Sequence, residues 1–255
     1  MKHGRYKHAR KIYRIGYIAA FIIMLLLAFL TYYGQYSGNF VMTVDEQAYD
    51  RGISVSEDPN FETYARWLTA DAVEEVREIT LNQIEGFDLG RILTTNGSFR
   101  ESLIYGASAR LNYLAYTFYL KNVGRYETNV GYEVVIEEVT GMLASAIRIM
   151  IIEDGYIEQS QVNVTRLSTL KEGSYKLYQA PDTIEKDYYT ELATYREFVS
   201  DTVICSEQIK NLGADQMKKF TILMWLEGED PDCVYENVDY IYGSKIKIAM
   251  NFFLL

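Results

Sequence analysis

The chain has 255 residues and a formal net charge of -10, with 25 basic and 35 acidic side chains. All the acidic residues and 19 of the basic ones lie beyond residue 33, so that part carries 19 minus 35, or -16. Because nucleic acids and anionic lipids attract basic surfaces, this charge argues against both as partners of that part. Its roughly 220 residues suffice for one domain of β-sandwich size.

A stretch without charged residues, 15–33, follows the basic segment 1–14. As a helix with about 1.5 Å rise per residue it would cover roughly 28 Å, close to the ~30 Å hydrocarbon core of a bilayer. Six basic residues precede this stretch, which favours a cytoplasmic N-terminus and an extracellular C-terminal domain. The sequence therefore predicts a single-pass protein of the cell membrane, held in the lipid bilayer by a transmembrane helix at 15–33.

The alternative for this stretch is a cleaved secretory signal, because its strictly apolar centre, 18–30, also fits the length of a signal core. Signal cleavage needs small residues at a fixed spacing, and no small-x-small pair precedes a plausible cut after Leu25. An uncleaved anchor is therefore favoured. Both interpretations place the remainder outside the cytoplasm, and cleavage itself stays open.

The first elements beyond the anchor are short. Alternating apolar residues predict a strand at 38–44. Residues 45–60 are polar and predict a loop that contains a strand-like run at 53–55. Residues 71–85 fit either an amphipathic helix or a loop that passes into a strand at 78–82, and the second is favoured.

The longest β region follows a segment with turn signals, 91–109. Residues 110–121 are apolar on both faces, which predicts a central strand. After a turn at 122–124, a second strand is expected at 129–139. The two strands form either a hairpin or a connection that crosses between two sheets.

The middle of the chain predicts a helical turn at 141–146 and a strand at 147–153, which the dipeptide Asp154-Gly155 closes. A weaker strand is expected at 175–178.

The C-terminal part begins with a surface loop or poorly patterned helix at 184–198. Three strands are expected after it, at 199–205, 217–227 and 243–252, and the last has the cleanest alternation in the chain. In the second of these, Trp225 lies on the parity that is expected to face outward.

About six or seven firm strands, with few weaker ones and no regular helices between them, predict an all-β fold. The expected architecture over residues 38–255 is an antiparallel β-sandwich of the jelly-roll or Ig-like kind, preceded by the transmembrane helix.

The residues needed for common hydrolytic chemistry are missing beyond the anchor. Both histidines, His3 and His8, lie in the basic tail. This excludes Ser-His-Asp and Cys-His hydrolases and zinc peptidases with an HExxH motif. Ser168 and Lys171 have the spacing of a Ser/Lys catalyst, but this spacing is common by chance and its companion motifs are absent. The prediction is that the protein is not an enzyme and has no catalytic residue.

Acidic residues gather in two places, Glu137-Glu138 and the group Glu227, Glu229, Asp230 and Asp232. They fit solvated loops, the paired carboxylates of a glycosidase or, for Glu229, Asp230 and Asp232, the oxygen ligands of Ca²⁺. Solvated loops are favoured because the spacing of an EF-hand is incomplete. The sequence therefore predicts no metal site and no cofactor.

Two further residue types leave alternatives open. Cys205 and Cys233 either form a disulfide or stay free thiols. Exposed aromatics, such as Trp67, Trp225 and the tyrosines at 188–189, would form a sugar-binding platform, whereas aromatics of a β-sandwich more often pack in the core or on a sheet face.

Several stretches carry a likeness to a known group: GNFVMTV after the apolar segment, AYTFYLKNVG, YEVVIEEVTG, and FTILMWLEGEDPDC with GSKIKIAMNF near the C-terminus. This plan resembles membrane-linked surface proteins of Bacillota, whose β-sandwich domains are similar to the TasA and camelysin group of biofilm-matrix proteins. The resemblance implies a jelly-roll-like sandwich and assembly by strand addition, after signal cleavage frees the N-terminal strand. The chain departs from the group at that cleavage site, and no functional residue is carried over.

These observations combine into one expectation of function. The chain is expected to be a membrane-anchored structural or interaction protein of the bacterial cell surface, with sheet edges and acidic loops as contact surfaces for protein partners or for self-association. The alternative is a carbohydrate-binding module of the cell envelope.

Overall fold

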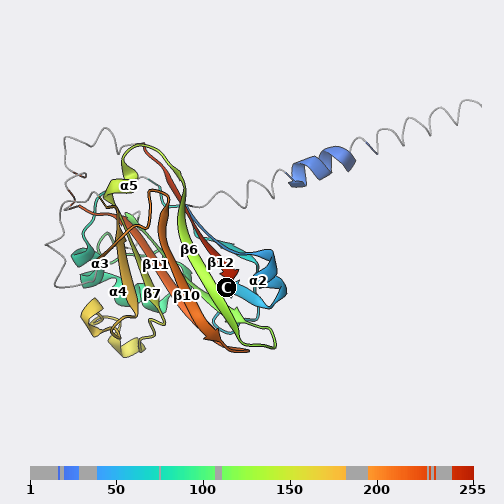
Figure 1. Cartoon of the computed structure of the whole chain (residues 1–255). Coiled ribbons are helices and arrows are strands. Elements are labelled where there is room, and N and C mark those ends of the chain that lie inside the picture. The colour runs from blue at the N-terminus through green and yellow to red at the C-terminus, as the bar shows by residue number, and fades with distance from the viewer. Residues whose placement is uncertain are drawn as a thin grey trace, which may run out of the picture. The chain divides into compact units, whose positions relative to one another are not determined.

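The computed structural model describes residues 17, 20–28, 39–74, 76–106, 111–181, 195–228, 230, 233 and 243–255. They belong to two compact units, Met1–Ser37 and Gly38–Leu255. In the first unit, residues 20–28 form an exposed helix (Figure 1). Among the residues described, no helix combines the length and the apolar character that a membrane crossing needs. Much of the predicted span 15–33 lies outside them, so the transmembrane helix stays a prediction.

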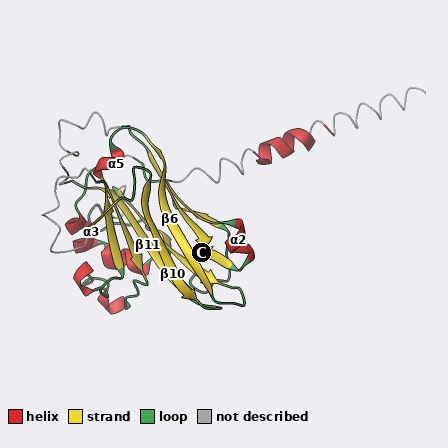
Figure 2. Ribbon diagram, viewed as in Figure 1, coloured by secondary structure: helices red, strands yellow, loops and turns green. Residues whose placement is uncertain are grey.

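The second unit contains two β-sheets with short helices beside them (Figure 2). The smaller one, sheet A, has five strands in the order β10-β6-β12-β1-β3. Its strands are β1 (Phe40–Val44), β3 (Trp67–Thr69), β6 (Thr128–Val139), β10 (Val203–Leu212) and β12 (Ile246–Leu254).

Sheet B has seven strands in the order β2-β5-β11-β7-β8-β9, and β4 pairs with β5. Its strands are β2 (Ile53–Ser56), β4 (Gly97–Ser98), β5 (Tyr113–Asn122), β7 (Ile147–Glu153), β8 (Tyr175–Gln179), β9 (Tyr195–Glu197) and β11 (Met217–Leu226). The β-rich architecture and the central position of β5, whose two faces are both buried, are confirmed. The link between β5 and β6 crosses from sheet B to sheet A, so the hairpin alternative is wrong.

The unit is not all-β, which corrects the predicted fold class. Its helices are α2 (Glu46–Asp50), α3 (Leu81–Phe87), α4 (Leu89–Thr94) and α5 (Leu143–Ala146), with the 3-10 turns η1 (Gln159–Gln161) and η2 (Leu167–Thr169). The strand expected at 78–82 is wrong because Thr80 caps α3: its side chain accepts a hydrogen bond from the Gln83 amide, and the Gln83 side chain accepts one from the Thr80 amide.

The sheets are mixed, so the expectation of a purely antiparallel sandwich is also wrong. β1 and β12 run parallel, with Phe40 opposite Ile248 and Val44 opposite Phe252. β8 and β9 are parallel as well. A short turn imposes an antiparallel direction on the strands that it joins, whereas β1 and β12 come from opposite ends of the domain and their relative direction is not set by any turn.

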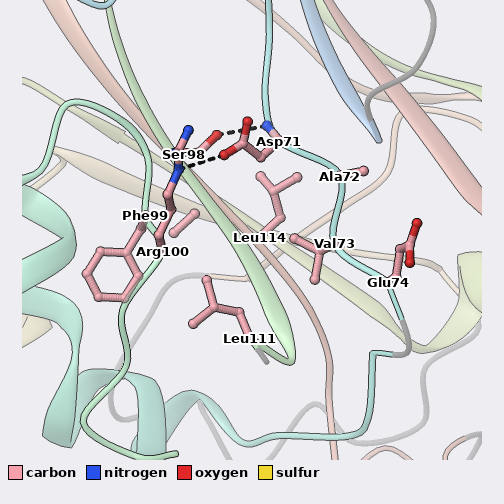
Figure 3. A pocket seen from close by; sticks show the side chains of 10 residues that line it. Asp71, Ala72, Val73, Glu74, Ser98, Phe99, Arg100, Leu111 and Leu114 are labelled. Carbon is pink, nitrogen blue, oxygen red and sulfur yellow. Dashed lines mark hydrogen bonds and ion pairs between the residues drawn. The ribbon is translucent and has the colours of Figure 1, made fainter. Parts of the chain in front are cut away.

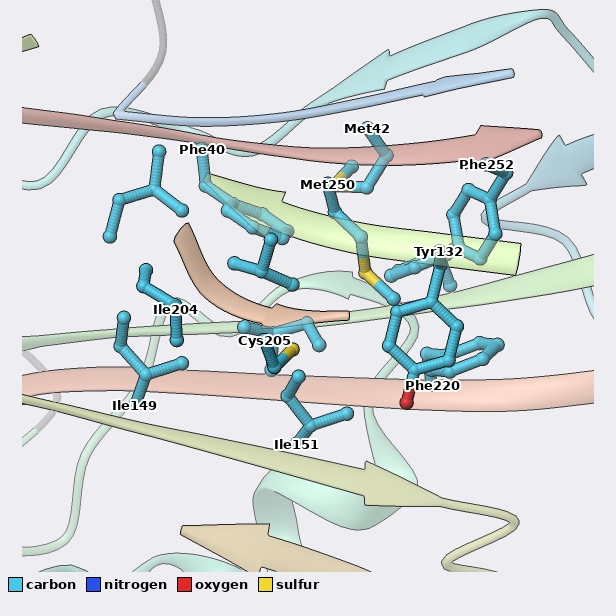
Figure 4. Packing of buried hydrophobic residues seen from close by; sticks show 14 of the residues in the cluster. Phe40, Met42, Tyr132, Ile149, Ile151, Ile204, Cys205, Phe220, Met250 and Phe252 are labelled. Carbon is cyan, nitrogen blue, oxygen red and sulfur yellow. The ribbon is translucent and has the colours of Figure 1, made fainter. Parts of the chain in front are cut away.

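The main core lies between the two sheets. Figure 4 shows Tyr132, Met250 and Phe252 of sheet A pointing toward Ile151 and Phe220 of sheet B. The Phe220 ring has its centroid 5.6 Å from that of Tyr132 and 5.7 Å from that of Phe252, both in edge-to-face geometry. The alternation read in β6, β11 and β12 is therefore confirmed as the pattern that fills this core.

A second core covers the other face of sheet B. Apolar residues of β5, β7 and β11 on that face pack against α3, α4 and the loops around them; the cluster includes Ile84, Leu89, Ile92, Leu93, Tyr113, Met150, Leu223 and Trp225. Figure 1 shows α3 and α4 on the side of β7 and β11 that is turned away from β6 and β12. Sheet B is therefore covered on both faces.

A buried lysine joins this helical layer to sheet B. Lys219 of β11 donates hydrogen bonds from Nζ to the carbonyl oxygens of Leu93 (2.6 Å) and Gly155 (3.1 Å). Burial lowers the pKa of this ammonium from 10.5 to about 8. Lys219 shares the parity of Trp225 in β11, which the alternation predicts to face outward, but the layer formed by α4 and the 154–174 loop covers it.

Candidate interaction face

The outer face of sheet A, opposite the core, displays one side chain from each of its five strands in a single row. Strand register places these residues side by side, and we call them the outer row: Ser206 (β10), Glu133 (β6), Asn251 (β12), Thr43 (β1) and Trp67 (β3). With about 4.8 Å between neighbouring strands, the row is roughly 19 Å long. Four of its members are polar and the fifth is an aromatic ring.

Hydrogen bonds order the outer row in two pairs. Thr43 Oγ1 donates to Asn251 Oδ1 at 2.5 Å, and Ser206 Oγ donates to Glu133 Oε1 at 3.2 Å. Within the described part of the chain, the amide nitrogen of Asn251 and Oε2 of Glu133 make no hydrogen bond. A donor and an acceptor at the centre of the row are therefore available to a ligand.

An aromatic ring lies in the next row of the same face. Phe253 of β12 is opposite Gly131, which is opposite Gln208 of β10. A Cβ added to Gly131 would lie only 2.4 Å from Cε2 of Phe253, so the ring rests over the glycine backbone. Any larger residue at position 131 would displace this ring.

The two tryptophans have opposite surroundings. Trp67 has an exposed fraction of 39%, whereas Trp225 has 2%. Trp225 donates from Nε1 to Glu227 Oε2 at 2.8 Å within the second core. Of the aromatics considered for a sugar-binding platform, Trp67 is at the surface and Trp225 is a core residue; 188–189 lie outside the described residues.

The acidic segment is a buried structural element where it is described. Asp230 Oδ2 lies 2.6 Å from Arg148 Nη2, and both side chains are almost completely buried. Glu227 is buried as well and accepts from the Leu81 amide at 3.4 Å. The solvated-loop interpretation is therefore wrong for these two residues. Asp230 is buried against Arg148 of β7, and Glu227 is buried against the first residue of α3. Glu229 and Asp232, the other two predicted calcium ligands, lie outside the described residues.

The remaining candidates are not brought together. Ser168 and Lys171 are both exposed, and in the described part of the chain neither side chain makes a hydrogen bond or ion pair. Glu137 pairs with Lys247 (2.8 Å) across the outer face of sheet A. Glu138 is exposed.

Both cysteines are free thiols, so the disulfide alternative is wrong. Cys205 is buried in the main core, and burial raises its thiol pKa to about 12. Cys233 has its pKa raised to about 12 for the same reason, with nearby carboxylates adding to the effect. Neither thiol has the low pKa of a reactive cysteine.

A polar network closes one side of the sandwich. Lys176 Nζ lies 3.0 Å from Glu207 Oε2 and 3.5 Å from Glu153 Oε1. Tyr132 donates to Glu153 at 2.8 Å and Tyr178 to Glu207 at 3.1 Å. The two carboxylates share one cation between sheets A and B, which indicates a structural link between the sheets.

A pocket of about 340 Å³ opens beside the start of β5 (Figure 3). Val73, Phe99 and Leu114 contribute apolar walls, and Arg100 Nε lies 2.8 Å from Asp71 Oδ2 at the rim. None of the residues predicted as candidates lines it. Across the described ranges, no three His, Cys, Asp or Glu side chains are grouped so that they could hold a metal ion.

No family model, no curated protein and no solved structure matches this chain. The likeness to the TasA and camelysin group therefore stays a prediction.

The sequence did not predict the outer row, although the pattern of one of its strands was visible. The alternation of the last strand already separates Asn251 from the inward-facing residues. What the sequence does not show is that β1 lies between β3 and β12, which brings Thr43 and Trp67 next to Asn251.

Proposed function

We propose that this protein is a structural or interaction protein of the bacterial cell surface, anchored in the membrane through residues 15–33. Residues 38–255 are its extracellular part. The observation that carries the proposal is the difference between the sheets: helices and loops cover the outer face of sheet B, whereas the outer face of sheet A presents Trp67 and polar side chains. A face with this composition is suited to contact with another molecule.

Two other observations support a role in binding. The acidic excess of -16 beyond the anchor keeps such a domain soluble beside an anionic membrane. Among the described residues, the edge strands of sheet A are poorly suited to strand addition, because β3 has three residues and the pairing of β10 with β6 has two irregularities. The face is therefore a better contact surface than the edges on which the sequence-based expectation relied.

The test is the accessibility of the outer face in intact cells. Gln208 lies on this face and is exposed, so Q208C should react with a membrane-impermeant thiol reagent. H3C, in the basic tail, should react only after the membrane is made permeable. The parent chain measures the background from Cys205 and Cys233. Labelling of H3C alone in intact cells would overturn the proposed topology.

A role in a biofilm matrix is the finer form of the proposal and rests on the resemblance to the TasA and camelysin group. Electron microscopy of the concentrated full-length chain in detergent tests it. Ordered filaments would support matrix assembly, and a persistent monomer would count against it.

A further inference from the structure

We propose that the outer face of sheet A binds a neutral, extended polysaccharide that runs diagonally from Trp67 of the outer row to Phe253 in the next row, with both rings as stacking platforms. This inference rests on the proposed function, since it names the ligand class of the same face. It combines three observations: the spacing of two aromatic rings, the polar groups beside them, and the charge of the outer row.

The spacing of the rings suits a chain of sugars. Trp67 and Phe253 are separated by two strand spacings across the sheet and by two residues along β12. With about 4.8 Å between strands and 3.4 Å per residue, their backbone positions lie roughly 12 Å apart. The Phe253 ring extends further from Trp67 than this, because it lies over Gly131 of β6. A hexose in an extended β-1,4-linked chain advances by about one strand spacing, so the two rings can stack on two non-adjacent sugars of one chain.

The polar side chains of the outer row beside the rings match sugar hydroxyls. Each hydroxyl is both a donor and an acceptor, and the unengaged amide nitrogen of Asn251 and Oε2 of Glu133 are neighbours in the row. The pairs Thr43–Asn251 and Ser206–Glu133 restrict the side-chain rotamers before a ligand arrives. This reduces the entropy that binding has to overcome.

The charge of the outer row favours a neutral polymer over an anionic one. The outer row contains Glu133 and no cation. On the same face of β12, Lys247 is engaged by Glu137 at 2.8 Å. An anionic polysaccharide would meet Glu133 and the domain's excess of 16 negative charges without a free lysine or arginine in the row.

The test uses intrinsic fluorescence, because the chain has two tryptophans and Trp225 is buried. Full-length protein in detergent is titrated with cellohexaose, xylohexaose and chitohexaose. At least one should change the tryptophan emission and bind, as measured independently by calorimetry. W67A should lose the fluorescence response and bind about tenfold more weakly, and F253A should weaken binding to a similar extent.

Matched variants separate stacking from general damage. Tyr126 is 78% exposed in the loop after β5, so Y126A should bind like the parent chain. W67Y keeps a ring and should retain most of the affinity. G131A should displace the Phe253 ring without deleting it and should also weaken binding.

Three results would overturn the inference. They are absence of binding to all three hexasaccharides at millimolar concentration, equal affinity of W67A, F253A and the parent chain, and tighter binding of polygalacturonate than of any neutral probe. The surface role would survive each of them if Q208C is still labelled in intact cells. Labelling of H3C alone would instead remove the proposed function and leave the binding data intact.

Discussion

The outer faces of sheets A and B show how one chain uses the same alternating pattern for two purposes. On sheet B, the residues that alternate with the main core are mostly apolar, with buried Lys219 and Arg148 among them, and α3, α4 and the 154–174 loop cover this face. On sheet A, the outer row is polar apart from Trp67, and the rows beside it contain Phe253 on one side and Val41, Ala249 and Val135 on the other. The difference teaches that outward parity in a strand does not mean exposure; the composition of the outward set decides whether another layer covers it.

The largest difference in stability between variants of the two faces is expected when their tryptophans are replaced. W225A should lower the free energy of unfolding by about 4–5 kcal/mol, because it leaves a cavity in the second core and removes a donor from buried Glu227. Urea unfolding followed by circular dichroism measures this. A loss below about 1 kcal/mol would mean that the layer on sheet B is loosely packed.

Breaking the ion pair between Arg148 and Asp230 should lower the free energy of unfolding by a somewhat smaller amount. D230N leaves the Arg148 guanidinium buried without its carboxylate partner, so the free energy of unfolding should fall by about 3 kcal/mol. E137Q, which removes the carboxylate of an ion pair on sheet A, is the matched control and should cost less than about 1 kcal/mol. Equal effects of the two variants would contradict the contrast between the covered and the open face.

Lys219, on the covered face of sheet B, should make the free energy of unfolding depend on pH. Its folded-state pKa is about 8 and its ordinary value is 10.5, so between these values the unfolded chain binds the proton and the folded chain does not. This lysine therefore contributes stability that rises with pH from about 8 to 10. Between pH 8 and 10, the free energy of unfolding of the parent chain should rise by about 1–2 kcal/mol relative to that of K219M. Comparison with the variant is needed because the raised pKa values of both buried thiols act in the opposite direction.

The smallest effect is expected on the open face. W67A removes a partly exposed ring from a three-residue edge strand, so the free energy of unfolding should change by less than about 1 kcal/mol. Thermal unfolding of the variant, measured beside W225A, checks this. A large loss would make Trp67 a packing residue and would weaken its proposed role in binding.

Short-range patterns predicted much of the fold. The alternation around Phe220 and Met250 and the turn at Asp154-Gly155 correctly gave the strands that enclose the main core. The pattern failed for α3, where capping by Thr80 outweighs a strand-like composition. Local patterns could not predict contacts between residues that are distant in the sequence, such as Arg148 and Asp230, which are 82 positions apart. The outer row could not be predicted for the same reason, since it depends on the register of five strands.

The parallel pairing of β1 with β12 affects how the domain would respond to tension. The start of β1 and the end of β12 lie at opposite ends of this five-residue ladder, so pulling on the two ends of the domain draws the strands past each other along their length. In that geometry the backbone hydrogen bonds of the ladder resist together, whereas an antiparallel pair of terminal strands would unzip one bond at a time. Residues 38–255 should therefore resist extension more strongly than a domain whose terminal strands pair in antiparallel fashion.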